Sequence, residues 1–327
     1  MKRYGKLYAK FTAFENLLLA YKKARKGAVG KKETQLFTFY LEKELFQLQE
    51  ELVKGRYQPQ AYRYFKIFDP KERLISVATF RDRVVHHALI NILEPIYERC
   101  FIYDSYATRK NKGTHKAILQ AQYYLKQTGW FWKTDIDKYF DHIHQTTLIN
   151  LLKRKIKDPK LLNVAERIIR NGGVNGTGLP IGNLTSQFFA NVYLNSFDHF
   201  VKETLRIKQY IRYMDDFVLF HQDKNQLKSK RILIQSFLKE ELGLSLKPSA
   251  TFLNSAQNGL TFLGRRIFPN TIRIARPNGK RMIRRMQKKK QEYQEGIIEE
   301  TTYLQSMNSY WAQLADFKGL RHELLKK

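Results

Sequence analysis

Two adjacent aspartates, Asp215 and Asp216, are the residues of this chain best suited to chemistry. They follow a Tyr-Met dipeptide and stand between two short apolar runs, residues 209–212 and 217–220. Two such runs with a tight polar break between them predict a β-hairpin that carries the acidic pair at or beside its turn. Neighbouring carboxylates repel each other, and an apolar setting adds to the cost of their charge. Because hard carboxylate oxygens suit Mg²⁺, the pair predicts a metal site rather than a solvated turn.

A site for two metal ions needs a further carboxylate from elsewhere in the chain. The aromatic run at residues 130–132 predicts a strand, and Asp135, the best candidate, falls near its end. Asp137 shares a strand face with Asp135 only while the strand continues, and Asp141 belongs to the following turn or helix. Either of these two could instead be a solvated charge or an acid at a helix N-terminus. Spacing alone does not choose among the three.

These residues resemble the catalytic motifs of reverse transcriptases. Asp-Ile-Asp-Lys-Tyr-Phe-Asp at residues 135–141 is similar to the first motif, and Tyr-Met-Asp-Asp at 213–216 is similar to the second. Further similar motifs stand in the same order at residues 71–85, 109–117, 241–246 and 259–264. The resemblance runs from about residue 64 to 275. It implies an α+β, right-hand polymerase with fingers, a palm that contains an antiparallel sheet, and a helical thumb.

The segment from Gly178 to Gln187, Gly-Leu-Pro-Ile-Gly-Asn-Leu-Thr-Ser-Gln, indicates a subfamily. Most reverse transcriptases have Gln where Ile181 stands and Pro where Gln187 stands. The combination found here is similar to reverse transcriptases of diversity-generating retroelements, in the bacterial and phage lineage of group II intron-like enzymes. Those elements copy a template-repeat RNA into cDNA with errors at template adenines, and the cDNA replaces a variable repeat in a target gene.

The resemblance implies a role for single residues. Asp135, Asp215 and Asp216 would be the catalytic metal ligands of a two-Mg²⁺ site, in which Mn²⁺ can substitute. The implied dNTP-binding residues are Lys71, Arg73, Phe140, Ile181 and Gln187.

Arg73 is a better triphosphate ligand than Lys71, because a bidentate guanidinium suits phosphate oxygens. Phe140 stands where the family has a bulky ribose gate, although it could also be a core residue. Related enzymes often carry a Lys-Thr pair where this chain has Ala250-Thr251, so Lys247 could act as the general acid only from a shifted position.

The implied domains are basic N-terminal helices with fingers (1–125), a palm (126–275) with an insertion near 150–178, and a basic helical thumb (276–327). We expect a helix from Thr34 to Lys54, ended by Gly55. After the punctuation at Arg276-Pro277-Asn278-Gly279-Lys280 we expect a cationic helix. Its basic stripe is Arg281, Arg284, Arg285 and Lys288, at helical spacing. Such a stripe is suited to the phosphates of a duplex, and a solvated helix face is the alternative.

Composition agrees with a nucleic-acid enzyme. The chain has 59 Lys and Arg against 30 Asp and Glu, a net charge of +29, which predicts a polyanionic partner but does not tell RNA from DNA or an acidic membrane. Cys100 is the single cysteine, so an intrachain disulfide is excluded. The chain begins without the apolar core of a signal peptide, and it has no run of about 18 apolar residues. A cytoplasmic protein without a membrane partner is expected.

The leading hypothesis is an RNA-directed DNA polymerase that copies a template-repeat RNA into error-prone cDNA. Its partners would be the template RNA, the RNA/DNA duplex, dNTPs and a small accessory protein. One alternative is another bacterial reverse transcriptase, of the intron-encoded or antiphage-defence type. Intron enzymes usually carry a maturase after the thumb, and this chain offers no sequence for one. The other alternative is a non-catalytic RNA-binding protein on a polymerase scaffold, against which the three intact aspartates argue.

Overall fold

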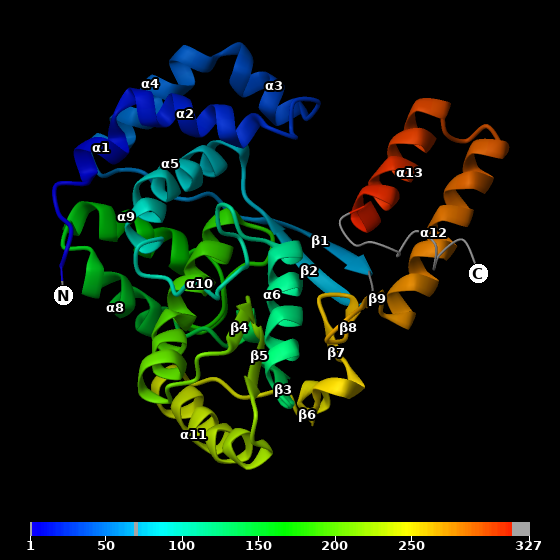
Figure 1. Ribbon diagram of the computed structural model, residues 1–327. Helices are drawn as coiled ribbons and strands as arrows, with labels where there is room; N and C mark the ends of the chain where they lie inside the picture. The colour runs from blue at the N-terminus through cyan, green and yellow to red at the C-terminus, as the bar shows by residue number, and fades with distance from the viewer. Residues whose placement is uncertain (1, 69–70, 316–327) are drawn as a thin grey trace. The chain divides into compact units, whose positions relative to one another are not determined.

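The computed structural model describes residues 2–68 and 71–315 (Figure 1). Asp69, Pro70 and the last part of the expected thumb, 316–327, lie outside the described residues. The chain divides into two compact units. The first contains Met1–Thr108, Ile136–Arg206 and Ile232–Lys247, and the second contains Arg109–Asp135, Ile207–Arg231 and Pro248–Lys327. Because both units are discontinuous, these boundaries cut across the expected fingers, palm and thumb, whose limits stay a prediction.

The first unit is mainly helical. Its elements are α1 (Tyr8–Thr12), α2 (Phe14–Arg25), α3 (Lys32–Phe39), α4 (Leu41–Val53), β1 (Arg63–Phe68), β2 (Glu72–Val77), α5 (Phe80–Tyr97), α7 (Tyr139–His142), α8 (Gln145–Lys155), α9 (Pro159–Arg170), α10 (Leu184–His199) and a π-helix (Phe200–Thr204). The residues of α11 (Lys224–Leu242) divide between the two units. The core of the first unit is aliphatic and aromatic, and α5 packs against both α2 and α10.

The helix expected from Thr34 to Lys54 is two helices. α3 and α4 are separated at Tyr40, whose φ of −102° and ψ of 30° interrupt the helical backbone. The expected stop is confirmed, because Gly55 adopts a φ of +68° that glycine accepts without strain. The next two elements form a hairpin: β1 and β2 are antiparallel, with Arg63 opposite Val77 and Phe68 opposite Glu72.

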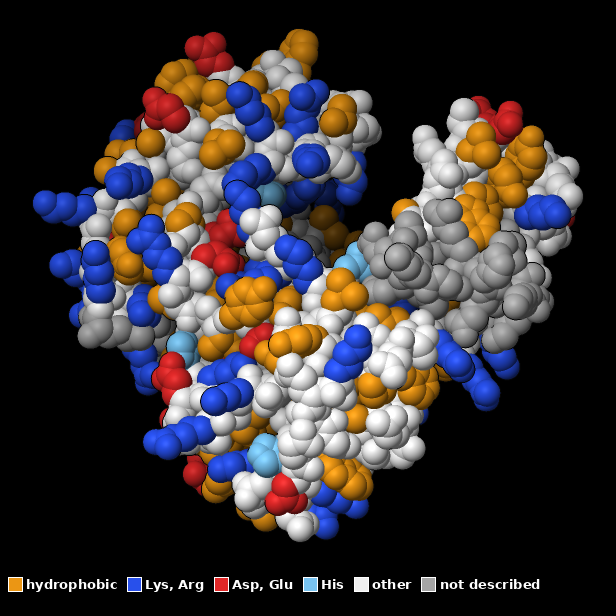
Figure 2. All heavy atoms as spheres, viewed as in Figure 1, with side chains coloured by type: hydrophobic (Ala, Val, Ile, Leu, Met, Phe, Trp, Pro, Cys, Tyr) orange, Lys and Arg blue, Asp and Glu red, His pale blue; other side chains and the backbone are white. Residues whose placement is uncertain are grey.

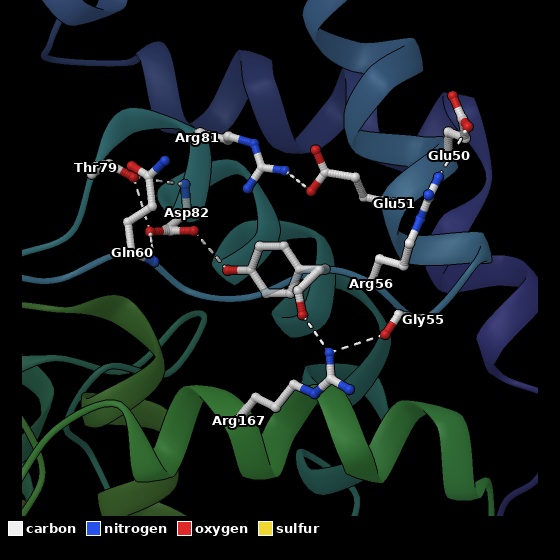
Figure 3. A network of polar contacts seen from close by, with 10 residues as sticks. Glu50, Glu51, Gly55, Arg56, Gln60, Thr79, Arg81, Asp82 and Arg167 are labelled. Atoms are coloured by element: carbon white, nitrogen blue, oxygen red, sulfur yellow. Dashed lines mark hydrogen bonds and ion pairs between the residues drawn. The ribbon is translucent and has the colours of Figure 1, made fainter.

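A buried polar network holds the chain just before the hairpin to the start of α5 (Figure 3). Asp82 is 1% exposed, and its carboxylate accepts hydrogen bonds from the Tyr57 hydroxyl (2.8 Å), the Gln60 N–H (2.9 Å) and the Thr79 hydroxyl (2.9 Å). Arg167 of α9 donates to the carbonyls of Gly55 and Tyr57. Since a buried carboxylate is costly unless its oxygens are bonded, these partners fix the path of residues 55–60.

The second unit is built on an antiparallel sheet in the order β4-β5-β3-β6. The strands are β3 (Trp130–Asp135), β4 (Tyr210–Tyr213), β5 (Asp216–His221) and β6 (Phe252–Ser255). α6 (Thr114–Gln127) packs on this sheet, where the rings of Tyr124 and Phe220 lie 5.5 Å apart. The aromatic residues of β3 suit a central strand, since both of its edges are paired and Phe131 and Trp132 are buried.

The rest of the second unit contains a three-stranded antiparallel sheet and the C-terminal helices. These elements are β7 (Leu260–Phe262), β8 (Arg265–Ile267), β9 (Ile272–Ile274), α12 (Arg276–Gln294) and α13 (Glu300–Ala315). The expected cationic helix is present, but its expected start after Lys280 was wrong. α12 begins at Arg276, because a proline in the first helical turn needs no N–H partner and its fixed φ suits a helix.

Lys and Arg side chains are spread widely over the visible face and cover more of it than Asp and Glu side chains do (Figure 2). This agrees with the net charge of +29. Among the described residues, no helix has the length and apolar character needed to cross a membrane.

Candidate active site

The acidic pair lies on the predicted hairpin. β4 and β5 are antiparallel, with Tyr213 directly opposite Asp216, and the two residues of the turn between them are Met214 and Asp215. Met214 has a φ of +58°, an uncommon backbone conformation for a residue other than glycine. Non-glycine residues in this region cost on the order of 1–3 kcal/mol and occur most often at functional sites.

Arg212 braces this turn from inside the protein. Its side chain is 0% exposed, and one guanidinium nitrogen donates a 3.0 Å hydrogen bond to the Met214 carbonyl. Arg212 could not be identified from the sequence, because nothing in the local pattern distinguishes a buried arginine from an exposed one in a short strand.

The sheet register selects Asp135 from the three candidates in the first motif. Asp135 is the last residue of β3 and lies directly opposite Asp216 of β5. Asp137 comes after the strand, where its N–H donates 2.9 Å to the Ser245 carbonyl, and Asp141 is exposed in the short helix α7. Of the three, only Asp135 is paired with a residue of the Asp215-Asp216 dipeptide.

The carboxylates of this cluster repel one another. Burial, followed by the charge of Asp135, raises the pKa of Asp215 to about 7. Burial also raises the pKa of Asp216, to about 6, although Lys133 opposes the increase. The Lys133 ammonium lies 2.9 Å from an Asp216 carboxylate oxygen, with the two side chains 15% and 22% exposed.

Lys133 contacts the acidic pair and is not among the residues predicted from the sequence. A signal was present, since residues two apart in a strand share a face and Lys133 stands two before Asp135. On β5, Asp216 is the diagonal neighbour of Lys133, within the reach of a long side chain.

The donor chemistry of this cluster fits a divalent cation. Three carboxylates from β3 and the β4–β5 hairpin supply hard oxygen ligands. The raised pKa values of Asp215 and Asp216 indicate that protein groups do not fully compensate the charges of these two side chains. Within the described ranges, no group of three His, Cys, Asp or Glu side chains is arranged as a formed metal site. The lysine at 2.9 Å is therefore the cation that compensates Asp216 in this structure.

The implied nucleotide-binding residues lie in the first unit, and each is described there. Lys71 and Arg73 are exposed, and Arg73 stands on β2 opposite Ile67. The Ile181 carbonyl accepts a 2.7 Å hydrogen bond from the Ser76 N–H, so the structure brings the Ile181 loop onto the strand that carries Arg73. Gln187 is half-buried in the first turn of α10.

Gly182 makes the close approach of this loop to β2 possible. Its φ is +115°, and a Cβ at this position would lie 2.9 Å from the Ser76 carbonyl oxygen. The Asn183 side-chain amide donates to the same oxygen at 3.2 Å. The loop between Ile181 and Asn183 is therefore fixed to β2 by backbone and side-chain contacts.

Phe140 and Tyr139 have different environments. Tyr139 is buried, and its hydroxyl donates 2.5 Å to the Ala190 carbonyl, whereas Phe140 is half-buried. Tyr139 is thus the packing residue of the pair, which leaves the Phe140 ring partly accessible. Lys247 is half-buried and follows Leu246, which pairs with Ile136 in an isolated bridge.

The basic stripe of α12 has the expected spacing. Arg284, Arg285 and Lys288 are exposed, and Arg281 is half-buried. Lys288 also lies 3.8 Å from Glu292, one helical turn on, a weak exposed pairing that leaves its charge accessible.

Comparisons with known proteins agree with these observations. Residues 68–267 match the family described as "Reverse transcriptase (RNA-dependent DNA polymerase)". Protein YkfC of Escherichia coli K12 is 28% identical over 272 residues, which cover 68% of this chain and 71% of YkfC. The group II intron-encoded protein LtrA of Lactococcus lactis is 31% identical over 172 residues, which cover 50% of this chain and 29% of LtrA.

A putative COX1/OXI3 intron 2 protein of Saccharomyces cerevisiae is 25% identical over 259 residues, which cover 59% of this chain and 30% of that protein. The matches thus span less than a third of either intron protein. Among solved structures, telomerase from Candida albicans in complex with a fragment of telomeric RNA has a TM-score of 0.50 at 13% identity, over 68% of this chain and 47% of that one. This likeness concerns the fold alone.

Proposed function

Because the chain belongs to the reverse transcriptase family of RNA-dependent DNA polymerases and has the α+β right-hand polymerase fold, we propose that it adds nucleotides to a primer 3′-OH at Asp135, Asp215 and Asp216. The pairing of Asp135 with Asp216, next to the strained turn that carries Asp215, is the observation that supports this assignment. Paired carboxylates at one edge of a sheet suit phosphoryl transfer, which needs positioned metal ions rather than a covalent intermediate.

The three carboxylates would hold two Mg²⁺ ions, with Mn²⁺ as a substitute, and these ions when bound activate the attacking oxygen and neutralise the pyrophosphate. Lys133 favours the ionised form of Asp216 and so keeps this ligand available below pH 7. Arg212 and the strained Met214 fix the backbone of the turn and so the position of the Asp215 carboxylate relative to that of Asp216. Preorganisation of this kind avoids rearrangement during the reaction.

The other residues would bind and select substrates. Arg73 and Lys71 would contact the triphosphate, and the Phe140 ring would exclude a ribose 2′-OH by steric conflict. The α12 stripe would contact phosphates of the template–primer duplex through charge, without reading its sequence.

The test of the active site replaces each aspartate with asparagine, which keeps side-chain size and removes the charge. Asp135→Asn, Asp215→Asn and Asp216→Asn should each abolish Mg²⁺-dependent extension of a DNA primer on an RNA template. Asp141→Asn is the matched control, since Asp141 belongs to the same motif but is exposed on α7. Near-normal extension by any of the first three variants would remove that aspartate from the site.

The finer function that we propose is error-prone copying of a template-repeat RNA, as in a diversity-generating retroelement. It rests on Ile181, in the loop fixed to β2, and on Gln187, in the first turn of α10. Ile181 is β-branched and can neither donate nor accept a side-chain hydrogen bond to an incoming nucleotide. The loss of one such contact at a desolvated site weakens discrimination by about 1–3 kcal/mol, or roughly ten- to a hundredfold.

A bias towards adenine further requires that correct pairing opposite adenine be the weakest in this pocket. On that premise, Ile181→Gln should lower misincorporation opposite template adenine more than opposite the other bases. The measurement is deep sequencing of cDNA from one RNA template, with Ile181→Leu as the apolar control. An adenine error rate that is equal in the Gln and Leu variants would show that Ile181 does not set the bias.

An intron-encoded reverse transcriptase is the second candidate, and the similarity to LtrA and the yeast intron protein favours it. The two candidates differ in priming. A retroelement enzyme that depends on a small accessory protein should copy generic primed RNA when purified alone, and should make little cDNA from its own repeat RNA. Specific initiation on that RNA without a second protein would contradict the accessory-protein proposal.

A further inference from the structure

A groove of about 880 Å³ lies in the first unit, where the start of the chain passes the beginning of α9. A volume of this size is in the range of sites that take nucleotide-sized ligands. The groove is lined by Arg3, Tyr4, Gly5, Lys6, Tyr8, Ala9, Thr12, Val53, Lys157, Asp158, Pro159 and Lys160. None of these residues is among those assigned to polymerisation.

The groove is strongly cationic. Its lining contains four exposed basic side chains, those of Arg3, Lys6, Lys157 and Lys160. Asp158 is the one acid among the lining residues, and it is 8% exposed.

The carboxylate of Asp158 is occupied by the fold. It accepts hydrogen bonds from the N–H groups of Leu7 (2.7 Å), Tyr8 (2.9 Å) and Leu161 (3.3 Å). Four basic side chains against this one carboxylate give the lining a formal net charge of +3. The groove therefore attracts anions.

The walls of the groove are held in place by backbone contacts. The backbone N–H of Tyr4 donates to the Lys155 carbonyl, and the Tyr4 carbonyl accepts from the Lys157 N–H, both at 2.8 Å. These two bonds form an isolated parallel bridge between Tyr4 and Ile156. A Cβ on Gly5 would lie 2.8 Å from Cε of Lys157, so the two segments are in close contact. The Tyr8 hydroxyl donates to the Leu52 carbonyl. A site with this bracing is formed before a ligand arrives.

Two half-buried tyrosines give the groove aromatic faces. The Lys2 ammonium lies 5.7 Å from the Tyr4 ring centroid, and the Lys160 ammonium lies 5.8 Å from the Tyr8 ring centroid. Rings next to flexible cations are the combination by which proteins hold single-stranded nucleic acid, because bases stack on the rings while phosphates meet the ammonium groups. Paired bases of a duplex are already stacked and cannot use the rings in this way.

We propose that this groove binds a single-stranded RNA segment, with Arg3, Lys6, Lys157 and Lys160 on the phosphates and Tyr4 or Tyr8 under a base. The site goes beyond nucleotide addition at the carboxylates, since it would hold a part of the RNA that is not being copied.

The first test compares the salt dependence of RNA binding in two triple variants. Lys6→Gln/Lys157→Gln/Lys160→Gln removes three groove cations. Lys228→Gln/Arg231→Gln/Lys239→Gln removes the same charge from exposed positions of α11. The probe is a fluorescein-labelled 20-nucleotide oligouridylate, and its Kd is measured by anisotropy between 50 and 300 mM KCl.

The slope of log Kd against log salt should fall by about 2 in the groove variant, because each lost contact with a single-strand phosphate lowers the slope by about 0.7. It should stay at the wild-type value in the α11 variant. Equal slopes in the two variants would overturn the proposal. Thermal melting of both variants checks the fold. The binding assay needs no catalysis, so a failed polymerase assay leaves its outcome intact.

The second test separates stacking from charge. Tyr4→Leu keeps the backbone bridge and removes the ring. Affinity for the oligouridylate should fall about five- to a hundredfold, the range of one base–aromatic stack, while affinity for an abasic strand of the same length stays unchanged. An equal effect on both strands, or no effect on either, would remove the stacking role of Tyr4.

Discussion

Asp215→Asn should stabilise the metal-free protein while it abolishes activity. The pKa of Asp215 is raised from 3.8 to about 7, first by burial and then by the charge of Asp135. The folded state therefore holds its proton more tightly than the unfolded chain does. Stability from this group is fully present below pH 3.8, is lost progressively up to about pH 7, and stays lost at higher pH.

The size of the effect follows from the shift. Roughly three pKa units at about 1.4 kcal/mol each give an upper limit near 4 kcal/mol, and coupling to the neighbouring carboxylates reduces the expected gain to about 2–4 kcal/mol. At about 2–4 °C per kcal/mol for a chain of this size, the Tm of Asp215→Asn in EDTA should exceed the wild-type value by several degrees at pH 8, and by little at pH 4.

The assay is thermal unfolding by circular dichroism across this pH range, with and without Mg²⁺. Added Mg²⁺ should raise the Tm of the wild-type protein at pH 8 and leave that of Asp215→Asn nearly unchanged. The exposed control Asp141→Asn should shift the Tm in EDTA by no more than the equivalent of about 0.5 kcal/mol at either pH. A Tm of Asp215→Asn at or below the wild-type value at pH 8 in EDTA would refute the view that the carboxylates repel one another.

Three more predictions concern other contacts. Lys133→Met should raise the pKa of Asp216 by about one to two units, because a charged contact of 2.9 Å is lost, and the loss of primer extension at low pH should begin at a higher pH. Lys133→Arg should keep the wild-type pH profile. An unchanged pH profile in the Met variant would count against the ion pair. Gly182→Ala should lower the free energy of unfolding in urea by about 1–3 kcal/mol, because the alanine Cβ would meet Ile75 and Ser76 at a φ of +115°. The loss should exceed that of the control Gly176→Ala, in which the new Cβ meets nothing within 4 Å. Asp82→Asn should lower the free energy of unfolding by about 1–3 kcal/mol in the same assay, because the asparagine NH2 group would face one of the three groups that now donate hydrogen bonds to Asp82. A loss smaller than that of Tyr57→Phe would contradict the central role of Asp82.

The hairpin with its acidic pair could be predicted from the sequence because its determinants are local. Apolar runs on both sides of a polar break specify strand, turn and strand within a few residues. Asp135 could be placed at a strand end for the same reason, but its choice over Asp137 depends on the register with β5, which joins residues far apart in the sequence. Register depends on packing of the whole sheet, and no local pattern contains it.

The missed features depend on partners distant in sequence or on exceptions to local rules. The burial of Arg212 and the role of Asp82 follow from tertiary contacts, such as the hydrogen bond from Tyr57 to Asp82. The break at Tyr40 interrupts a continuous apolar pattern, so periodicity alone extended the helix across it. Pro277 and Gly279 are typical of loops, so the local pattern predicts a start of α12 after them, although the first turn of a helix accepts both residues.

The order of the strands has a consequence for synthesis of the protein. β3 ends at Asp135, and its neighbours β5 and β6 begin at Asp216 and Phe252. A ribosome must therefore add about 80 residues before the first edge of β3 can be paired and more than 100 before the second, and such non-local pairing is slow. During that interval the nascent chain carries Trp130, Phe131 and Trp132 on a strand with two open edges, which is a template for aggregation. Production of this polymerase should depend on translation speed and on chaperones that shield β3 until the acidic hairpin arrives.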